Sequence, residues 1–138
     1  MLLTIEKVLI LKTVSIFADT PDEILADVAA LLEEINVTAG ETILHKDDVG
    51  RCMYIIVAGR VRVHNGDQLI AYQGARDIFG ELAVLDAEPR SASVTAEVDT
   101  HLFRLDQEAF YELMADRFEV ARGIIRMLCR RVRAREVS

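Results

Sequence analysis

One stretch of this chain decides its interpretation: residues 79–94, which read FGELAVLDAEPRSASV. Gly80 and Glu81 precede a helix-prone run, and Pro89 and Arg90 follow it. Phosphate recognition needs backbone N–H groups that point in one direction, and the first turn of a helix supplies such groups. The order of residue types therefore predicts an anion-binding site in this stretch.

Each residue type in the stretch suits a different part of a nucleoside monophosphate. Leu82 and Ala83 begin the expected helical turn, and Gly80 lets a ligand approach the backbone closely. Arg90 offers a planar fork to phosphate oxygens. Glu81, turned aside from the phosphate, can accept a hydrogen bond from a sugar hydroxyl. The alternative is an internal ion pair between the glutamate and the arginine.

Glycines divide the region around the stretch into short β-branched runs, which predict strands. The expected strands are residues 42–44, 53–57, 61–63, 69–72, 93–97 and 101–105. Regular short strands separated by glycine turns are typical of an antiparallel sandwich or barrel. Asn65 and Gly66 predict a two-residue hairpin of type I′, because both central positions of that turn need a positive φ.

Helices are expected at both ends of the chain. Thr20 is the expected N-cap of a helix that starts at Pro21 and extends to about Leu32. After the strands we expect one helix over residues 107–114 and a longer one over about 118–135. The longer helix shows an apolar stripe (Val120, Ile124, Leu128, Val132) and a basic stripe (Arg122, Arg126, Arg130, Arg133).

Composition and charge limit the class of protein. The chain has 138 residues, of which 51% are apolar, and this suits one globular domain with a core. Seven arginines and two glutamates give residues 117–138 a net charge of +5, which leaves −12 for residues 1–116. An acidic body repels polyanions, so we expect no nucleic-acid surface on it. The apolar runs are too short to span a membrane, and we expect a cytoplasmic protein with free thiols at Cys52 and Cys129.

Catalytic and metal-binding classes find little support in the sequence. The three histidines, His45, His64 and His101, are scattered, so the ligand set of a metal-binding cupin is missing. The sequence also shows no recognisable serine–histidine–aspartate set of the kind that hydrolases use for nucleophilic catalysis. We therefore expect neither an enzyme nor a metal or cofactor site.

The stretch 79–94 resembles the phosphate-binding cassette of cyclic nucleotide-binding domains, which occur in catabolite activator proteins, protein kinase regulatory subunits and cyclic-nucleotide-gated channels. The family pattern is F-G-E-L-A, a short variable segment, and P-R-[ATS]-A-[ST]-V, and this chain matches it from Phe79 to Val94. Residues 54–63 look like the strand–glycine–strand signature of the family, and the turn 47–50 fits as well. The resemblance covers almost the whole chain.

The resemblance implies a role for each cassette residue. Glu81 would bind the ribose 2′-hydroxyl, and Arg90 would bind the cyclic phosphate. The amides of Gly80, Leu82 and Ala83, together with the Ser91 hydroxyl, would complete the phosphate cradle. Val63 and Ile70 match positions that line the purine pocket. The family uses a C-terminal helix as a lid over the base, and the candidates for the lid contact here are Arg122, Arg126 and Arg130.

Two positions depart from the family pattern. Arg76 stands where a glycine often occurs, which would stiffen or reshape that loop. Ser91 follows Arg90 where some members selective for cyclic AMP have alanine, and its hydroxyl could contact the amino group of a syn guanine. The preference between cyclic AMP and cyclic GMP therefore stays open.

The resemblance and the patterns together predict a mainly β fold with flanking helices. We expect a double-stranded β-helix, or jelly-roll barrel, in one domain over residues 1–138. Its parts are an N-terminal helical segment (1–35), a β-roll with the cassette (36–105) and C-terminal lid helices (106–136). The arrangement implies a domain of bacterial type that is either excised from a larger protein or a stand-alone sensor.

The predicted function is a regulatory module for signal transduction that binds a cyclic purine nucleotide, either cyclic AMP or cyclic GMP. The ligand would move the C-terminal helix, which could also join a second copy or an effector domain. The alternative is a docking module that keeps the fold but has lost the ligand. An arginine-rich helix that binds anionic lipid or nucleic acid is a weaker alternative.

Overall fold

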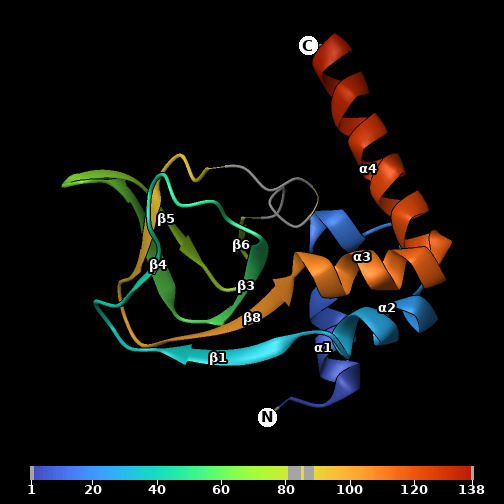
Figure 1. The fold of residues 1–138 in the computed structure, drawn as a ribbon, viewed down its shortest axis with the longest axis horizontal. Helices are drawn as coiled ribbons and strands as arrows, with labels where there is room; N and C mark the ends of the chain where they lie inside the picture. The colour runs from blue at the N-terminus through green and yellow to red at the C-terminus, as the bar shows by residue number, and fades with distance from the viewer. Residues whose placement is uncertain (1, 81–84, 86–88, 138) are drawn as a thin grey trace. The chain divides into compact units, whose positions relative to one another are not determined.

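The computed structural model describes residues 2–80, 85 and 89–137, and the side chains up to residue 136. Two compact units divide the chain. The first unit comprises Met1–Leu31 together with Glu108–Ser138, and the second comprises Leu32–Gln107. The first unit is built of helices and the second of strands (Figure 1).

The helical unit combines segments from both ends of the sequence. Its elements are α1 (Thr4–Leu11), the 3-10 helix η1 (Ser15–Phe17), α2 (Asp22–Ala29), α3 (Gln107–Asp116) and α4 (Phe118–Val137). Phe17 and Phe110 are fully buried and meet edge to face, with ring centroids 5.7 Å apart. This contact between η1 and α3 shows how the two ends of the chain share one core.

The helix α2 differs from its sequence prediction at both ends. Pro21 is the N-cap. The hydroxyl of its neighbour Thr20 is buried and has no hydrogen-bond partner among the described residues, so it does not cap the helix. The helix ends at Ala29, because the next residues lead directly into a strand that begins at Glu33. The predicted helical segment to residue 35 was therefore too long. The apolar spacing continues to Leu32, which is buried without being helical.

The strand unit consists of two four-stranded antiparallel sheets. The strands are β1 (Glu33–Val37), β2 (Thr42–Leu44), β3 (Cys52–Ala58), β4 (Arg60–Asn65), β5 (Gln68–Gly74), β6 (Ile78–Phe79), β7 (Ser93–Ala96) and β8 (Thr100–Asp106). The strand order is β1-β8-β3-β6 in one sheet and β2-β7-β4-β5 in the other. The predicted jelly roll, with helices at both ends of the sequence, is confirmed.

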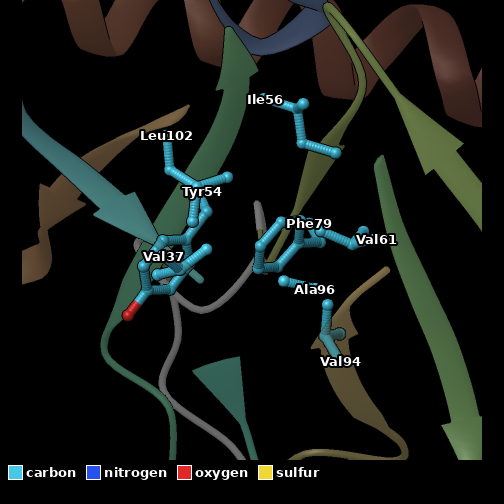
Figure 2. Packing of buried hydrophobic residues seen from close by; sticks show 8 residues of the cluster. All are labelled: Val37, Tyr54, Ile56, Val61, Phe79, Val94, Ala96 and Leu102. Atoms are coloured by element: carbon cyan, nitrogen blue, oxygen red, sulfur yellow. The ribbon is translucent and has the colours of Figure 1, made fainter. Parts of the chain in front are cut away.

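Side chains from both sheets fill the interior of the roll. Figure 2 shows eight of them: Val37, Tyr54, Ile56, Phe79 and Leu102 come from the first sheet, and Val61, Val94 and Ala96 from the second. Each full burial of such a side chain contributes about 1.5–3 kcal/mol. The interior is therefore apolar, as the alternating runs in the sequence predict.

The hairpin between β4 and β5 turns one residue later than the sequence prediction. Asn65 pairs with Gln68, so Gly66 and Asp67 are the two central residues. Gly66 has a φ of 59°, whereas no positive φ occurs at Asn65 or Asp67. A type I′ turn needs positive φ at both central residues, so the predicted type was wrong; a glycine at the first central position suits type II′.

The surface of α4 carries two apolar stripes rather than one. Val120, Ile124 and Met127 are buried within the helical unit. Ile125, Leu128 and Val132 are exposed, and they lie on a different side of the helix. The predicted single stripe through Val120, Ile124, Leu128 and Val132 therefore mixed a buried face with an exposed one.

Candidate functional site

Aromatic stacking anchors the start of the cassette. Phe79 lies on β6, pairs with Tyr54 of β3, and stacks on its ring with centroids 5.0 Å apart and an interplanar angle of 11° (Figure 2). Both rings belong to the core of the roll. This packing explains why an aromatic residue precedes the glycine, and it fixes where the cassette leaves the sheet.

Gly80 follows this anchor in a conformation that favours glycine. Its φ is 71°, and a Cβ built there would lie 2.8 Å from the carbonyl oxygen of Cys52 and 2.6 Å from Nη1 of Arg90. Because real Cβ atoms do not approach so closely, a side chain at this position would displace the arginine or the strand. Glycine is therefore needed for backbone conformation and for the arginine, in addition to the predicted close approach of a ligand.

The Arg90 guanidinium lies against backbone rather than beside an acid. Its Nη2 donates a hydrogen bond of 2.9 Å to the carbonyl oxygen of Cys52. Its Nε is buried and has no hydrogen-bond partner in the described structure. No ion pair involves Arg90 among the described residues. A guanidinium carries five N–H donors, so most of its donor capacity is not used by described groups.

Burial changes the electrostatics of this arginine. Desolvation lowers the pKa of Arg90 from its ordinary value, and it is the largest cause of the shift. The group nevertheless stays charged near neutral pH, because the ordinary pKa of arginine is very high. A half-buried positive charge without a described counter-charge is a site that favours an anion.

The backbone of Arg90 is held by a turn from another part of the sequence. The N–H of Arg90 donates to the carbonyl of Asp48, and the N–H of Asp47 donates to the carbonyl of Arg90, each over 2.8 Å. Val49 and Pro89 form an isolated antiparallel bridge beside these bonds. The turn 47–50 is therefore a structural support for the cassette arginine.

Several predicted cassette residues lie outside the described residues. These are Glu81, Leu82 and Ala83, so the structure leaves their predicted roles as predictions. Ser91 is exposed and follows Arg90 directly. Of the predicted cradle, the described part of the structure brings together Gly80 and Arg90.

The two predicted purine-lining residues occupy different environments. Val63 is half-buried and packs against the core of the roll. Its cross-strand partner is Ala71, and a shift of register follows between Val63 and His64. Ile70 falls at this irregularity and is 57% exposed. Their shared role in a purine pocket stays a prediction.

The three lid candidates on α4 also differ from one another. Arg130 forms an ion pair with Asp19 inside the helical unit. Arg122 and Arg126 are exposed. Arg130 would therefore have to leave an existing partner to contact a base, which makes it the least suited of the three.

Sequence reasoning noticed the turn 47–50 only as part of a resemblance and missed its contact with Arg90. An acidic turn that ends in glycine is visible in the sequence, but its pairing with a residue about forty positions later is not. Arg76 departs from the family pattern, in which a glycine is frequent at this position. The structure explains that preference, because the φ of Arg76 is 74°, a conformation that glycine adopts most easily.

Two further findings concern the described part of the chain. Within those residues, no three histidine, cysteine or acidic side chains gather closely enough to hold a metal ion. None of the helices found there is long and apolar enough to cross a membrane.

Comparison with known proteins identifies relatives over most of the chain. A CRP-like cAMP-activated global transcriptional regulator of Mycobacterium tuberculosis is 29% identical over 129 residues, which are 90% of this chain and 58% of the regulator. The Cyclic AMP receptor protein of Thermus thermophilus is 34% identical over 104 residues, which are 72% of this chain and 48% of the receptor. The chain thus spans about half the length of these relatives.

A solved structure agrees with these relatives. The N-terminal domain of a transcriptional regulator from Streptomyces coelicolor superposes with a TM-score of 0.85 at 30% identity, and the match covers 92% of each chain. The family model described as cyclic nucleotide-binding domain matches residues 34–117, which cover both β-sheets except Glu33 and include the cassette. The chain therefore belongs to the family of cyclic nucleotide-binding domains.

Proposed function

We propose that this domain binds cyclic AMP or cyclic GMP through the cassette and signals by movement of its C-terminal helix. One observation carries the proposal: the guanidinium of Arg90 is half-buried, and among the described residues its Nε has no hydrogen-bond partner and its Nη2 donates to one backbone carbonyl. A cyclic phosphate offers the anionic oxygens that this group lacks. In this proposal Glu81 binds the ribose, and the amides of Gly80, Leu82 and Ala83 with the Ser91 hydroxyl complete the cradle.

The names of the relatives support the choice of ligand class. The relative from Mycobacterium tuberculosis is described as cAMP-activated and the one from Thermus thermophilus as a cyclic AMP receptor. Those descriptions name a regulator and a receptor, and for this chain we propose a regulatory role in the cytoplasm without enzymatic activity. Ser91 leaves cyclic GMP as a second candidate ligand, because its hydroxyl could contact the guanine amino group.

Calorimetric titration of the full chain with cyclic AMP and with cyclic GMP tests the proposal. We expect one-to-one binding of at least one of them. Substitution Arg90→Ala should cost about 2–3 kcal/mol of binding free energy, since it removes charge-assisted hydrogen bonds. That loss corresponds to a drop in affinity of about 30-fold or more.

The matched control is Arg60→Ala, which removes an arginine from the outside of the same β-roll. Arg60 is exposed and lies over the ring of Tyr72, with its Cζ 4.5 Å from the ring centroid. We expect its loss to change affinity by about twofold at most. Equal affinity of wild type and Arg90→Ala would contradict the proposed contact between Arg90 and the phosphate. If neither nucleotide gave a heat of binding, the proposed sensor function would be wrong.

A second candidate function is a ligand-free docking module, and the exposed apolar stripe of α4 favours it. Ile125 and Val132 are more than half exposed, and Leu128 lies between them on the same side of the helix. Such a stripe is expected to meet a second copy of the chain or an effector domain. A domain with this surface and no response to either cyclic nucleotide would belong to this class.

A further inference from the structure

Gly50 ends the supporting turn and is buried, although no unusual backbone conformation requires a glycine there. Its φ lies outside the left-handed region, so other residues could adopt its backbone conformation. A Cβ built on Gly50 would overlap three atoms of Arg90, namely Nε, Cζ and Nη2. The guanidinium thus occupies the space in which the side chain of residue 50 would otherwise stand.

The same guanidinium also lies against the backbone of Gly80 and Cys52. A Cβ built on Gly80 would lie 2.6 Å from its Nη1, and its Nη2 donates to the carbonyl oxygen of Cys52. Two glycines and one strand carbonyl therefore form a slot that fits a planar, five-donor group. Within the described part of the chain, Nε is buried in this slot and has no hydrogen-bond partner.

We propose that Gly50 is a positioning residue, which holds the Arg90 guanidinium in its binding orientation by having no side chain. This inference rests on the proposed function, since the guanidinium is positioned for a cyclic phosphate. Position 50 lies outside the cassette, and its contribution is made through the arginine rather than by contact with the ligand.

A methyl group at position 50 should move the arginine and leave the turn in place. The turn is held by two backbone hydrogen bonds of 2.8 Å to Arg90 and by the bridge between Val49 and Pro89. The arginine side chain has several rotatable bonds and can leave the slot at lower cost than the backbone can shift. The expected consequence of Gly50→Ala is therefore a displaced guanidinium in a folded protein.

The first test is the NMR signal of the Arg90 Nε–H group in the full chain without ligand. A buried Nε–H exchanges slowly with water, so we expect a protected signal, assigned by its disappearance in Arg90→Ala. Gly50→Ala should make this signal exchange as fast as those of exposed arginines. The matched control is Gly74→Ala, because among the described atoms a Cβ there would meet only the carbonyl oxygen of Gly59, at 3.9 Å.

The second test is the affinity for cyclic AMP and cyclic GMP. Gly50→Ala should weaken binding about tenfold or more, as expected for the loss of at least one charge-assisted hydrogen bond. Gly74→Ala should stay within about twofold of wild type. In an Arg90→Ala background the substitution Gly50→Ala should cause no further loss, because the displaced group is already absent.

The outcomes separate this inference from the proposed function. A protected Nε–H signal that persists in Gly50→Ala overturns the inference, and so does normal affinity of that variant beside a weakened Arg90→Ala. An additional loss in the Arg90→Ala background would also overturn it, since the effect would then not act through the arginine. If wild type binds neither nucleotide, the proposed function fails, and the NMR comparison still decides whether Gly50 positions Arg90.

Discussion

Cys52 and Cys129 differ in the environment of their thiols, and this difference is a property of single residues. Cys52 is half-buried at the start of β3, with its Sγ 3.8 Å from Oδ1 of Asp106. Burial, followed by the charge of Asp106, raises the pKa of the Cys52 thiol. Cys129 is exposed on α4.

We therefore expect a thiol reagent at pH 8 to modify Cys129 at least about tenfold faster than Cys52, because the thiolate is the reacting form and a raised pKa reduces its share. Mass spectrometry of timed samples would measure the two rates, with Cys129→Ser and Cys52→Ser as reference variants. Guanidinium chloride should make the rates similar. Faster labelling of Cys52 than of Cys129 in the folded protein would contradict the burial of Cys52 and the raised pKa of its thiol.

Single residues also show how far a prediction from the sequence reaches. The chemistry of phosphate is the reason to predict a ligand contact for Arg90, and the need for close approach is the reason to predict one for Gly80; both roles stay predictions. The reasons found in the structure are additional: Gly80 has a positive φ and leaves room for Arg90. Such contacts depend on which strand passes nearby, so the local sequence does not contain them.

At the scale of the element, α4 has a glycine that helix propensity alone would disfavour. Gly123 is buried, and a Cβ there would lie 2.9 Å from Oγ1 of Thr20 and 3.3 Å from the backbone of Asp19. In an open helix position, replacing glycine with alanine stabilises by about 1 kcal/mol. Here we expect Gly123→Ala to lower the free energy of unfolding by about 1 kcal/mol or more, because the helix must move away from its neighbours.

Thermal or urea unfolding of the variant measures this effect. The double variant Gly123→Ala with Thr20→Ala removes the closer of the two contacts, so part of the lost stability should return. A more stable Gly123→Ala protein would show that propensity dominates and that α4 is not closely packed at this position.

The exposed stripe of α4 gives the second prediction at this scale. Replacing Ile125 and Val132 with glutamate places two charges on a surface that is now apolar. If the stripe joins two copies, wild type should sediment as a dimer and the double variant as a monomer, with unchanged cyclic nucleotide affinity. Arg126→Glu changes the charge on the neighbouring basic side of the helix, and it is the control for charge in the sedimentation measurement alone. A monomeric wild type would exclude a second copy of the chain as the partner of this stripe.

At the scale of the whole molecule, ligand binding and stability are linked. A ligand that binds only the folded state, at a concentration 100 times its dissociation constant, stabilises by about 2.7 kcal/mol. We expect cyclic AMP or cyclic GMP to raise the unfolding temperature of the wild type accordingly, in scans over ligand concentration. The same ligand concentration should give a much smaller rise in Arg90→Ala. An equal rise in both proteins would mean that the ligand binds somewhere other than the cassette.

The sequence by itself determined the fold class and most of the strands, and it predicted the chemistry of the site. Alternating apolar residues indicate a strand with one buried face. The cassette combines an acid, a glycine and an arginine at a spacing that is typical of few other functional sites. It also indicated α3 and α4, since both have helical periodicity. These features are local, so neighbouring residues are enough to specify them.

Tertiary structure alone decided the rest. The end of α2, the strand β1 and the division of α4 into buried and exposed stripes depend on what each segment meets in space. The slot around Arg90 is built from residues 50, 52 and 80, which the fold brings together. Contacts between segments far apart in the sequence have no local pattern, because they arise from strand pairing and from the packing of whole elements.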